Sequence, residues 1–436
     1  MKKYALVFLL PFLVLTACKP DKSEQDEIQY HGGTADLSCF IAIGNSLTAG
    51  YANGSLYRSG QVYSYPNIIA GQFAKAGGGT FVQPLLPGEA GWPEKRLVPG
   101  QRTGCSGNLY DAPVDYSGTD DTQGSSTNVA SQGPFNNLGI PGVRCVDLSF
   151  GGYVALNYYA TRMFSEPAKP LMDLLPQARA TFFSLWMGSN DVLGYATAGG
   201  TGAVSGMGLD DISPLAYFTA NYDTLVNRLT ANGAKGILIT IPDITRIPFF
   251  TTIQPEGLQL SQQQANDLNQ YYQGTDISFT TGANYYVIAD EEAPGGKRKM
   301  QPGEYLLLTV PIDSLTCGTW GKTTAIPDAY VLTASELGHI ESAIADFNQV
   351  IKDAATQHHL ALMDATAYLK SIAEGLDING LHFDSRFMSG GVFSLDGIHL
   401  TPRGYALLAN RIIQTVNDFY HGEIPEADVS TFPEGF

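Results

Sequence analysis

Three polar residues in this chain could together carry out nucleophilic catalysis. Ser46 lies near the N-terminus, whereas Asp396 and His399 lie near the C-terminus, three positions apart. A serine hydroxyl is a poor nucleophile unless a base removes its proton, and that base works best when a carboxylate fixes its tautomer. The spacing lets Asp396 reach one ring nitrogen of His399 while the other nitrogen faces a serine brought from elsewhere. The pattern predicts an acyl-transfer site, with His382 as the one competing base.

Two further residues could stabilise the negative charge that develops on the substrate oxygen during acyl transfer. Gly142 can present a backbone N–H with no side chain in the way, and Asn190 can present its side-chain amide. Loss of one such donor typically costs about 2.7–4 kcal/mol in the barrier. Each residue also has a purely structural alternative, a helix-entry turn for Gly142 and a turn or cap for Asn190.

The elements that would position these residues alternate between strands and helices. Ser46 follows the apolar run 40–43, and Asn190 follows the apolar run 180–187. Open α/β sheets bind their ligands at the carboxyl ends of the strands, which is where both residues would fall. We predict strands at 40–43, near 135–139, and at 180–187, 236–241 and 360–364, with helices at 65–76, 143–150, 155–164, 214–232, 334–358 and 401–420. This alternation favours an α/β fold with a parallel sheet and helices on both faces.

Two long segments interrupt the alternation, and we expect them to be insertions in a single domain. Residues 84–133 are rich in Gly, Pro, Ser, Thr and Asp and have no sustained periodicity, which predicts a functional loop or partial disorder. Residues 251–330 predict a helix at 261–273 and a hairpin formed by the runs 285–289 and 305–310.

Four cysteines besides Cys18 could form disulfides: Cys39, Cys105, Cys145 and Cys317. Their spacing matches no zinc pattern, and four cysteines allow three pairings. We expect two bridges that pin the insertions to the core, and the sequence leaves the pairing open.

The N-terminus has the features of an export signal. A basic start is followed by an apolar stretch at 4–15 and by small residues before Cys18. The last four of these residues resemble the bacterial lipobox, in which the cysteine is lipidated and becomes the first residue of the mature protein. The expected layout is a signal peptide at 1–17, a flexible tether at 18–34, one domain at 35–422 and a tail at 423–436. The protein should therefore be exported and anchored by lipid to the cell envelope, at the outer membrane or cell surface of a Gram-negative bacterium.

The net charge of the chain argues against two classes of binding partner, nucleic acids and anionic membranes. The chain has 25 basic and 42 acidic residues, a formal net charge of −17. Nucleic acids and anionic membrane surfaces are bound through cationic patches, so neither is expected as a partner. Contact with a membrane is expected only through the lipid at Cys18, and the substrate is expected to be a small-molecule, glycan or lipid ester.

Four short stretches occur in an order that resembles the SGNH, or GDSL-type, serine hydrolases. Residues 44–48, Gly-Asn-Ser-Leu-Thr, are similar to block I of that family, and residues 137–142 are similar to block II. Residues 188–191, Gly-Ser-Asn-Asp, resemble block III, and residues 396–399 resemble block V. One departure is Asn45, which stands where many members have Asp.

The resemblance implies a fold and a role for each site residue. The fold would be a three-layer α/β/α sandwich with a parallel sheet of about five strands, related to flavodoxin. Ser46 would be the nucleophile, His399 the general base and Asp396 its orienting carboxylate. Gly142, Asn190 and the backbone N–H of Ser46 would line the oxyanion hole, and the family needs no metal and no organic cofactor.

These observations together predict an exported, lipid-anchored serine esterase. A carbohydrate acetyl esterase is one reading, slightly supported by five aromatic residues in and near the first insertion: Tyr57, Tyr63, Trp92, Tyr110 and Tyr116. The alternatives are a lipase or lysophospholipase-type acylhydrolase, a peptidase, and a catalytically inactive glycan-binding surface lipoprotein.

Overall fold

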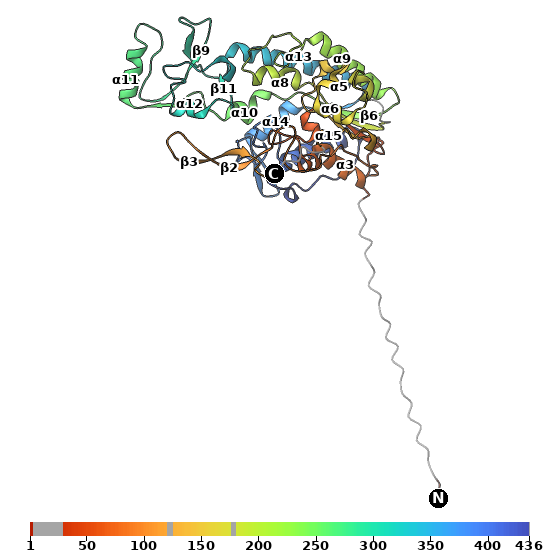
Figure 1. Ribbon diagram of the computed structural model, residues 1–436. Helices are drawn as coiled ribbons and strands as arrows, with labels where there is room; N and C mark the ends of the chain where they lie inside the picture. Colours follow the sequence, from red (N-terminus) through yellow and green to blue (C-terminus); the bar gives the residue numbers. More distant parts are fainter. Residues whose placement is uncertain (3–28, 120–124, 176–179, 436) are drawn as a thin grey trace.

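A five-stranded sheet lies at the centre of the computed structural model, which describes residues 1–2, 29–119, 125–175 and 180–435. The strand order is β13-β6-β5-β1-β4, and all neighbouring strands run parallel. The strands are β1 (Phe40–Gly44), β4 (Asn137–Gly139), β5 (Phe182–Trp186), β6 (Lys235–Ile239) and β13 (Ala361–Met363). Each lies where the sequence predicts a strand, and the expected α/β fold is confirmed (Figure 1).

The central strands are apolar because both of their faces are covered. Every residue of β1 and β5 is buried, as expected for parallel strands that cannot alternate between core and solvent. Gly44, the last residue of β1, pairs with Gly139 of β4 on one side and with Trp186 of β5 on the other. The carboxyl ends of β4, β1 and β5 therefore lie side by side.

Four long helices pack against the central five-stranded sheet. They are α3 (Tyr65–Lys75), α9 (Leu215–Thr230), α13 (Ala334–His358) and α15 (Pro402–Tyr420). Helix α3 contacts α15, and α9 contacts α13. Capping explains two of the starts: Thr333 and Glu336 form a capping box before α13, and the Thr401 hydroxyl accepts the N–H of Gly404 in α15. The four predicted helices match these bounds to within two residues at each end.

Short helices occupy the connections. They are α1 (Ser46–Ala49), α2 (Arg58–Val62), α5 (Tyr153–Leu156), α6 (Tyr158–Met163), α7 (Leu171–Leu174), α8 (Asn190–Thr197), α10 (Pro248–Thr251), α14 (Ala365–Glu374) and the 3-10 turn η2 (Cys145–Ser149). The predicted helix at 143–150 is only this 3-10 turn. The helix predicted at 155–164 is broken at Asn157, because its side chain accepts the N–H groups of Tyr159 and Ala160 and starts a new helix.

The first insertion contains a hairpin that the sequence analysis did not predict. Strand β2 (Leu97–Thr103) pairs antiparallel with β3 (Leu109–Asp115). Most of its side chains are exposed or half-buried, so the alternation of apolar and polar residues that marks a strand is missing. Pro99 and Pro113 are paired opposite each other in the two strands, and proline within a run argues against a strand when only the sequence is considered.

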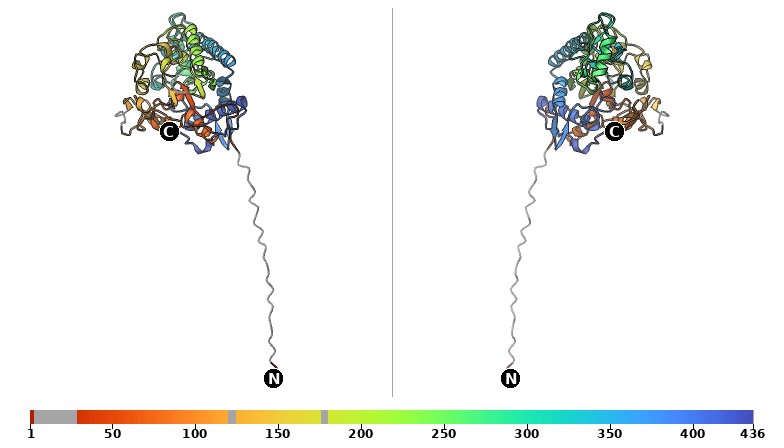
Figure 2. Two further views of the ribbon diagram at one scale, coloured as in Figure 1. Left: turned by 90° about the vertical axis from the view of Figure 1, so that its right-hand side faces the viewer. Right: turned by 90° about the vertical axis from the view of Figure 1, so that its left-hand side faces the viewer.

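The second insertion has its own hydrophobic core and forms one end of the molecule, coloured green to teal in Figures 1 and 2. Its elements are β7 (Leu258–Leu260), α11 (Gln262–Tyr271), β8 (Gly282–Asn284), β9 (Val287–Ala289), β10 (Lys297–Lys299), β11 (Tyr305–Leu306), α12 (Ile312–Thr316) and β12 (Val331–Leu332). The predicted helix at 261–273 is confirmed as α11.

The hairpin predicted from the runs 285–289 and 305–310 is wrong. Strand β9 pairs with β10, and β11 pairs with β12. The basic stretch read as a turn supplies β10, because Arg298 binds Asp290 on one side and Glu304 on the other. Arg298 thus connects β10 to Asp290, directly after β9, and to Glu304, directly before β11.

The expectation of two disulfides between the insertions and the core is also wrong. Cys105 and Cys317 form a bridge, and it joins the two insertions to each other. Cys39 and Cys145 are free. Cys39 is half-buried and precedes β1, where its N–H donates to Thr181, whereas Cys145 is buried in η2 against α9.

Both ends of the described domain pack onto α15. Thr34 donates its N–H to the carbonyl of Tyr420, and Glu423 donates its N–H to the carbonyl of His31. Ile424 and Val429 of the expected tail are buried. Residues 3–17 of the expected signal peptide, Cys18 and most of the expected tether lie outside the described residues. Within the described part of the chain, no helix has the length and apolar character needed to cross a membrane.

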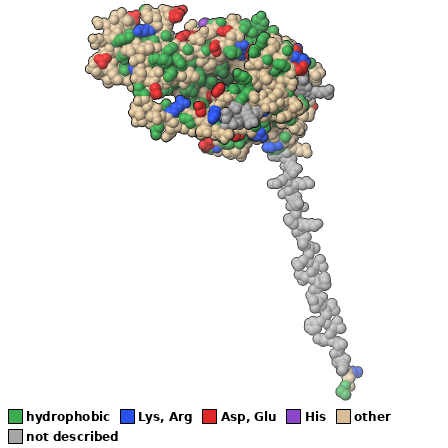
Figure 3. Space-filling view, viewed as in Figure 1, with side chains coloured by type: hydrophobic (Ala, Val, Ile, Leu, Met, Phe, Trp, Pro, Cys, Tyr) green, Lys and Arg blue, Asp and Glu red, His purple; other side chains and the backbone are tan. Residues whose placement is uncertain are grey.

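Acidic and basic side chains are interspersed on the face shown in Figure 3, with no continuous basic surface among the described residues drawn there.

Candidate active site

Ser46 is held at a sharp turn between strand and helix. It is the first residue of α1 and follows the end of β1 after a single residue, Asn45. The Asn45 side chain accepts the N–H of Leu47 at 3.2 Å and caps the helix. A Cβ at Gly44 would collide with Thr48 and with the carbonyl of Trp186, so only glycine fits between β1 and the helix. Asn45 thus has a local structural role.

Ser46, His399 and Asp396 are connected by hydrogen bonds. The distance between Ser46 Oγ and His399 Nε2 is 2.8 Å, and that between His399 Nδ1 and Asp396 Oδ2 is 2.9 Å. His399 is 8% exposed, and Ser46 is half-buried. The two ring nitrogens therefore face a nucleophile and a carboxylate, which is the arrangement that proton transfer from a serine requires.

The surroundings of Asp396 favour its ionised form. Burial opposes the charge, but His399 and the N–H groups of His399 and Ile398 outweigh it and hold the pKa of Asp396 well below its usual range. The carboxylate also accepts the N–H of Gly54 at 2.8 Å and the hydroxyl of Ser394 at 3.1 Å. A permanent charge at this position fixes the proton of the imidazole on Nδ1.

Gly142 and Asn190 lie on the two segments that flank Ser46. Gly142 follows β4 by three residues and Asn190 begins α8 after β5, while β1, which leads to Ser46, lies between these strands. Gly142 has φ +81° and is exposed. The Asn190 amide donates one hydrogen to the carbonyl of Val143 at 2.9 Å, so it ties the two flanking segments together and keeps its second hydrogen.

Asp191, which the sequence analysis did not single out, secures the same two segments. Its carboxylate is fully buried and accepts the N–H groups of Cys145 at 2.7 Å and Val146 at 3.3 Å. Burial raises the pKa of Asp191 to about 7, although these two hydrogen bonds act in the opposite direction. Asp191 thus fixes the loop after Gly142 relative to the helix that starts at Asn190.

His382, the competing base, lies elsewhere. Its Nδ1 is 2.9 Å from Asp377, its Nε2 is 3.6 Å from Asp384, and 54% of its side chain is exposed. It belongs to the small hairpin of β14 (Leu376–Ile378) and β15 (Leu381–Phe383), where it contacts these two carboxylates.

A row of aromatic rings extends from His399. The Tyr51 ring lies 4.6 Å from the His399 ring, and Tyr159 lies 6.5 Å from Tyr51 and 5.5 Å from Trp92. Tyr158 follows at 5.9 Å from Trp92 and is 64% exposed. Of the five aromatic residues considered from the sequence, only Trp92 belongs to this row. Tyr57 is fully buried, and Tyr116 lies against Arg96, so both serve packing.

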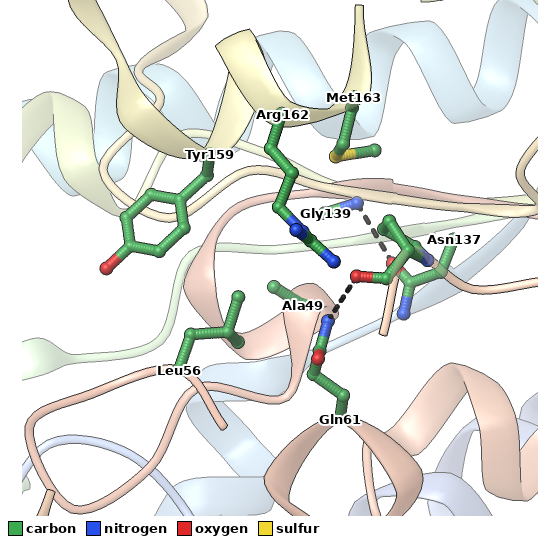
Figure 4. Close-up of a pocket in the computed structure, with 9 residues that line it drawn as sticks. Ala49, Leu56, Gln61, Asn137, Gly139, Tyr159, Arg162 and Met163 are labelled. Atoms are coloured by element: carbon green, nitrogen blue, oxygen red, sulfur yellow. Dashed lines mark hydrogen bonds between the residues drawn. The ribbon is translucent and has the colours of Figure 1, made fainter. Parts of the chain in front are cut away.

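A small cavity of about 10 Å³ lies behind the helix of Ser46, between Ala49, Leu56, Tyr159 and Met163 (Figure 4). Its polar side chains already have structural partners. Gln61 binds the carbonyl of Pro84 and the N–H of Leu86. Arg162 donates to three backbone carbonyls of the first insertion: Leu85, Ser125 and Thr127. We therefore assign these groups to holding the insertion in place.

Within the described residues, no group of three or more His, Cys, Asp or Glu side chains is arranged to hold a metal ion. No protein-family model matches the chain, and a search of curated proteins finds no match.

Proposed function

We propose that this protein is a serine hydrolase that cleaves carboxylic esters through an acyl-enzyme. The observation that carries the proposal is the hydrogen-bonded series Ser46–His399–Asp396, with distances of 2.8 Å and 2.9 Å, at the carboxyl end of β1. Three residue types in these contacts have the chemistry of an activated nucleophile, its base and an orienting carboxylate. The intact series argues against an inactive glycan-binding protein.

The geometry supports a two-step mechanism. Ser46 Oγ attacks the ester carbonyl and transfers its proton to His399 Nε2, while Asp396 stabilises the resulting imidazolium. The oxyanion is bound by the N–H of Ser46, the N–H of Gly142 and the free amide hydrogen of Asn190. His399 then protonates the leaving alcohol, and a water activated by the same residue releases the acid.

We assign the chain to the SGNH hydrolases on its four motif-like stretches and on the strand order. Counted along the chain, the sheet has the order 2-1-3-4-5, as in flavodoxin-like folds, whose sites lie where the strand order reverses. Ser46 follows strand 1, at that point. The two helix pairs, α3 with α15 and α9 with α13, support a three-layer arrangement (Figure 1).

We favour a carbohydrate ester, such as an acetylated glycan, as the substrate class. The aromatic row begins at His399, which protonates the leaving alcohol, so the rings lie on the alcohol side of the reaction. Flat rings suit the faces of sugars, and Tyr158 is the exposed ring of the row, whereas Trp92 is buried. The signal-like N-terminus and Cys18 support an exported protein anchored by lipid in the cell envelope, at the outer membrane or cell surface.

A lipid acylhydrolase is the second candidate. Four large apolar side chains near the segments of Gly142 and Asn190 are more than half exposed: Phe150, Leu156, Tyr158 and Leu209. Exposed apolar groups of this size are typical of surfaces that bind apolar ligands.

A series of p-nitrophenyl esters from acetate to octanoate, measured with the wild type and Ser46→Ala, tests the proposal. We expect hydrolysis by the wild type, loss of turnover in the variant, and labelling of Ser46 by a fluorophosphonate. A preference for acetate would support the glycan esterase, and rates that rise with chain length would support the lipid acylhydrolase. Equal activity of the variant would refute the assignment, and cleavage of amides alone would indicate a peptidase.

A further inference from the structure

The turn at Asn53 and Gly54 holds the triad carboxylate from outside its own segment. The N–H groups of Ile398 and His399 come from the same short turn as Asp396 itself. Gly54, in contrast, is 342 residues away in sequence and donates its N–H to Asp396 Oδ2 at 2.8 Å.

Ser394 is the second external contact, and Asn53 orients it. The Ser394 hydroxyl donates to Asp396 Oδ1 at 3.1 Å and accepts the N–H of Asn53 at 2.9 Å. Asn53 Oδ1 accepts the N–H of Leu395 at 2.9 Å. Asn53 therefore binds two consecutive residues just before Asp396, and both Asn53 and Ser394 are almost fully buried.

The backbone of Asn53 has an uncommon conformation that its contacts maintain. Its φ is +52°, a region that residues other than glycine adopt rarely and that persists where the surroundings enforce it. The side-chain amide donates to the hydroxyl of Tyr57 at 2.8 Å, so the backbone N–H and both ends of the side chain are bonded. This conformation leads directly into Gly54, whose N–H is directed at Asp396.

The same stretch of chain carries the nucleophile. Tyr51 donates its N–H to the carbonyl of Ser46 at 2.9 Å and its hydroxyl to the carbonyl of Gly54 at 2.6 Å. Its ring also packs against His399. Residues 46–54 thus contact the triad at its serine, its histidine and its carboxylate.

We infer that Asn53 is a positioning residue: with Gly54 and Ser394 it forms a clamp that fixes Asp396, and through it His399, relative to Ser46. This inference rests on the proposed esterase function. The backbone carbonyl of Asn53 also accepts the N–H of Leu97 at 2.8 Å, so the clamp is where the hairpin of the first insertion is attached to the site.

Asn53→Gly tests the clamp, because glycine accepts φ +52° while the side-chain contacts are lost. Asn379→Gly is the matched control, since Asn379 has φ +53° in an exposed turn. Ser394→Ala is the second variant and removes the hydroxyl between Asn53 and Asp396. We expect kcat for p-nitrophenyl acetate to fall about tenfold to a hundredfold in Ser394→Ala, which loses a hydrogen bond to the charged carboxylate, and by a similar factor in Asn53→Gly, which loses the contacts that orient Ser394 and Leu395, with KM changed less than about twofold.

The spectroscopic readout is the downfield proton resonance of the hydrogen bond between His399 Nδ1 and Asp396. We expect it to shift or broaden in Asn53→Gly and Ser394→Ala and to remain in Asn379→Gly. Wild-type kcat together with an unshifted resonance in both clamp variants would overturn the inference. The resonance needs no substrate, so a wild type that cleaves no ester would refute the proposed function while the clamp is judged on the resonance alone.

Discussion

Cys105 and Cys317 are joined by a disulfide across 212 residues of sequence, with their Cα atoms 6.2 Å apart. The bridge connects the turn of the β2–β3 hairpin to the end of α12. At its other end, the hairpin is bonded to Asn53 through Leu97. The second insertion reaches the segment of Asp396 by way of Phe249: the N–H of Leu308 in the insertion donates to the carbonyl of Phe249 at 2.9 Å, and the N–H of Phe249 donates to the carbonyl of Gly397 at 3.0 Å. Both insertions are thus connected to the residues around Asp396 as well as to each other.

Removal of this disulfide should destabilise the insertions. The hairpin is largely exposed, so little packing replaces the covalent link. We expect Cys105→Ser to lower the free energy of unfolding by about 2–5 kcal/mol, the usual range for a native bridge. Thermal unfolding and limited proteolysis near residue 105 would measure it. A reductant should lower the Tm of the wild type and leave that of the variant unchanged; equal sensitivity of both proteins would contradict the prediction.

Asn190→Ala should reduce catalysis more than binding. If the free amide hydrogen of Asn190 stabilises the oxyanion, its loss should lower kcat by roughly 10²–10³-fold with little change in KM. Steady-state kinetics with p-nitrophenyl acetate would measure both constants. An effect confined to KM would instead make Asn190 a substrate-binding residue. Unfolding of the variant should also be measured, because the same amide binds Val143.

Gly142→Ala should lower activity by changing the orientation of the backbone N–H at residue 142. A Cβ at Gly142 would have room, since its nearest neighbour is Asn157 Nδ2 at 3.9 Å, but φ +81° is strained for alanine by about 1–2 kcal/mol. Relief of that strain would turn the N–H away from the oxyanion, and we expect kcat to fall at least tenfold.

Gly303→Ala is the matched control for this substitution. Gly303 has φ +89°, is exposed and has open space around a Cβ, but it lies in the second insertion. Its substitution should cost similar stability and leave kcat near that of the wild type. Equal kcat losses in the two variants would show that backbone strain, and no local role of Gly142, explains the effect.

The core of the fold and the contact between Asp396 and His399 could be predicted because short-range patterns encode them. Continuous apolar runs marked the parallel strands, and Asp396 and His399 are close enough in sequence for their contact to be expected. The β2–β3 hairpin could not be predicted from the sequence. It is stabilised by backbone hydrogen bonds between its two strands and by a disulfide to a distant residue, so its strands do not show the alternation of apolar and polar residues that marks a half-buried strand. The pairing of β9 with β10 depends on Arg298 contacting two acids in three dimensions.

The clamp and Asp191 were missed for related reasons. Asn53 and Gly54 form a dipeptide that marks a turn, yet nothing local indicates that the turn meets Asp396 from 342 residues away. Asp191 looks like an ordinary acidic residue in the first turn of a helix. Only burial beneath the loop of Cys145 reveals what it binds.

Asp191 should make the stability of the fold depend on pH between about 4 and 7. Burial raises its pKa to about 7, whereas the unfolded chain has the ordinary value of 3.8. In this window the folded protein keeps a proton that the unfolded chain has lost, so stability falls as pH rises. The cost is complete above pH 7, where Asp191 is ionised in both states. Asp396 has the opposite effect on stability, because its pKa is lowered in the fold. Its ionised form stabilises the fold above about pH 4, and this stabilisation is lost only as the pH falls below that value.

Asp191→Asn isolates this effect, because the amide oxygen can still accept the N–H of Cys145 while the side chain no longer titrates. We expect the free energy of unfolding of the variant, relative to the wild type, to rise with pH by up to about 1.4 kcal/mol for each pH unit between 4 and 7. Urea unfolding of both proteins at pH 4.5, 5.5, 6.5 and 7.5 gives this difference directly, and other titrating groups cancel in it. Parallel stability curves for the two proteins would mean that Asp191 is already ionised in the fold, and that the two backbone N–H groups suffice to stabilise its buried charge.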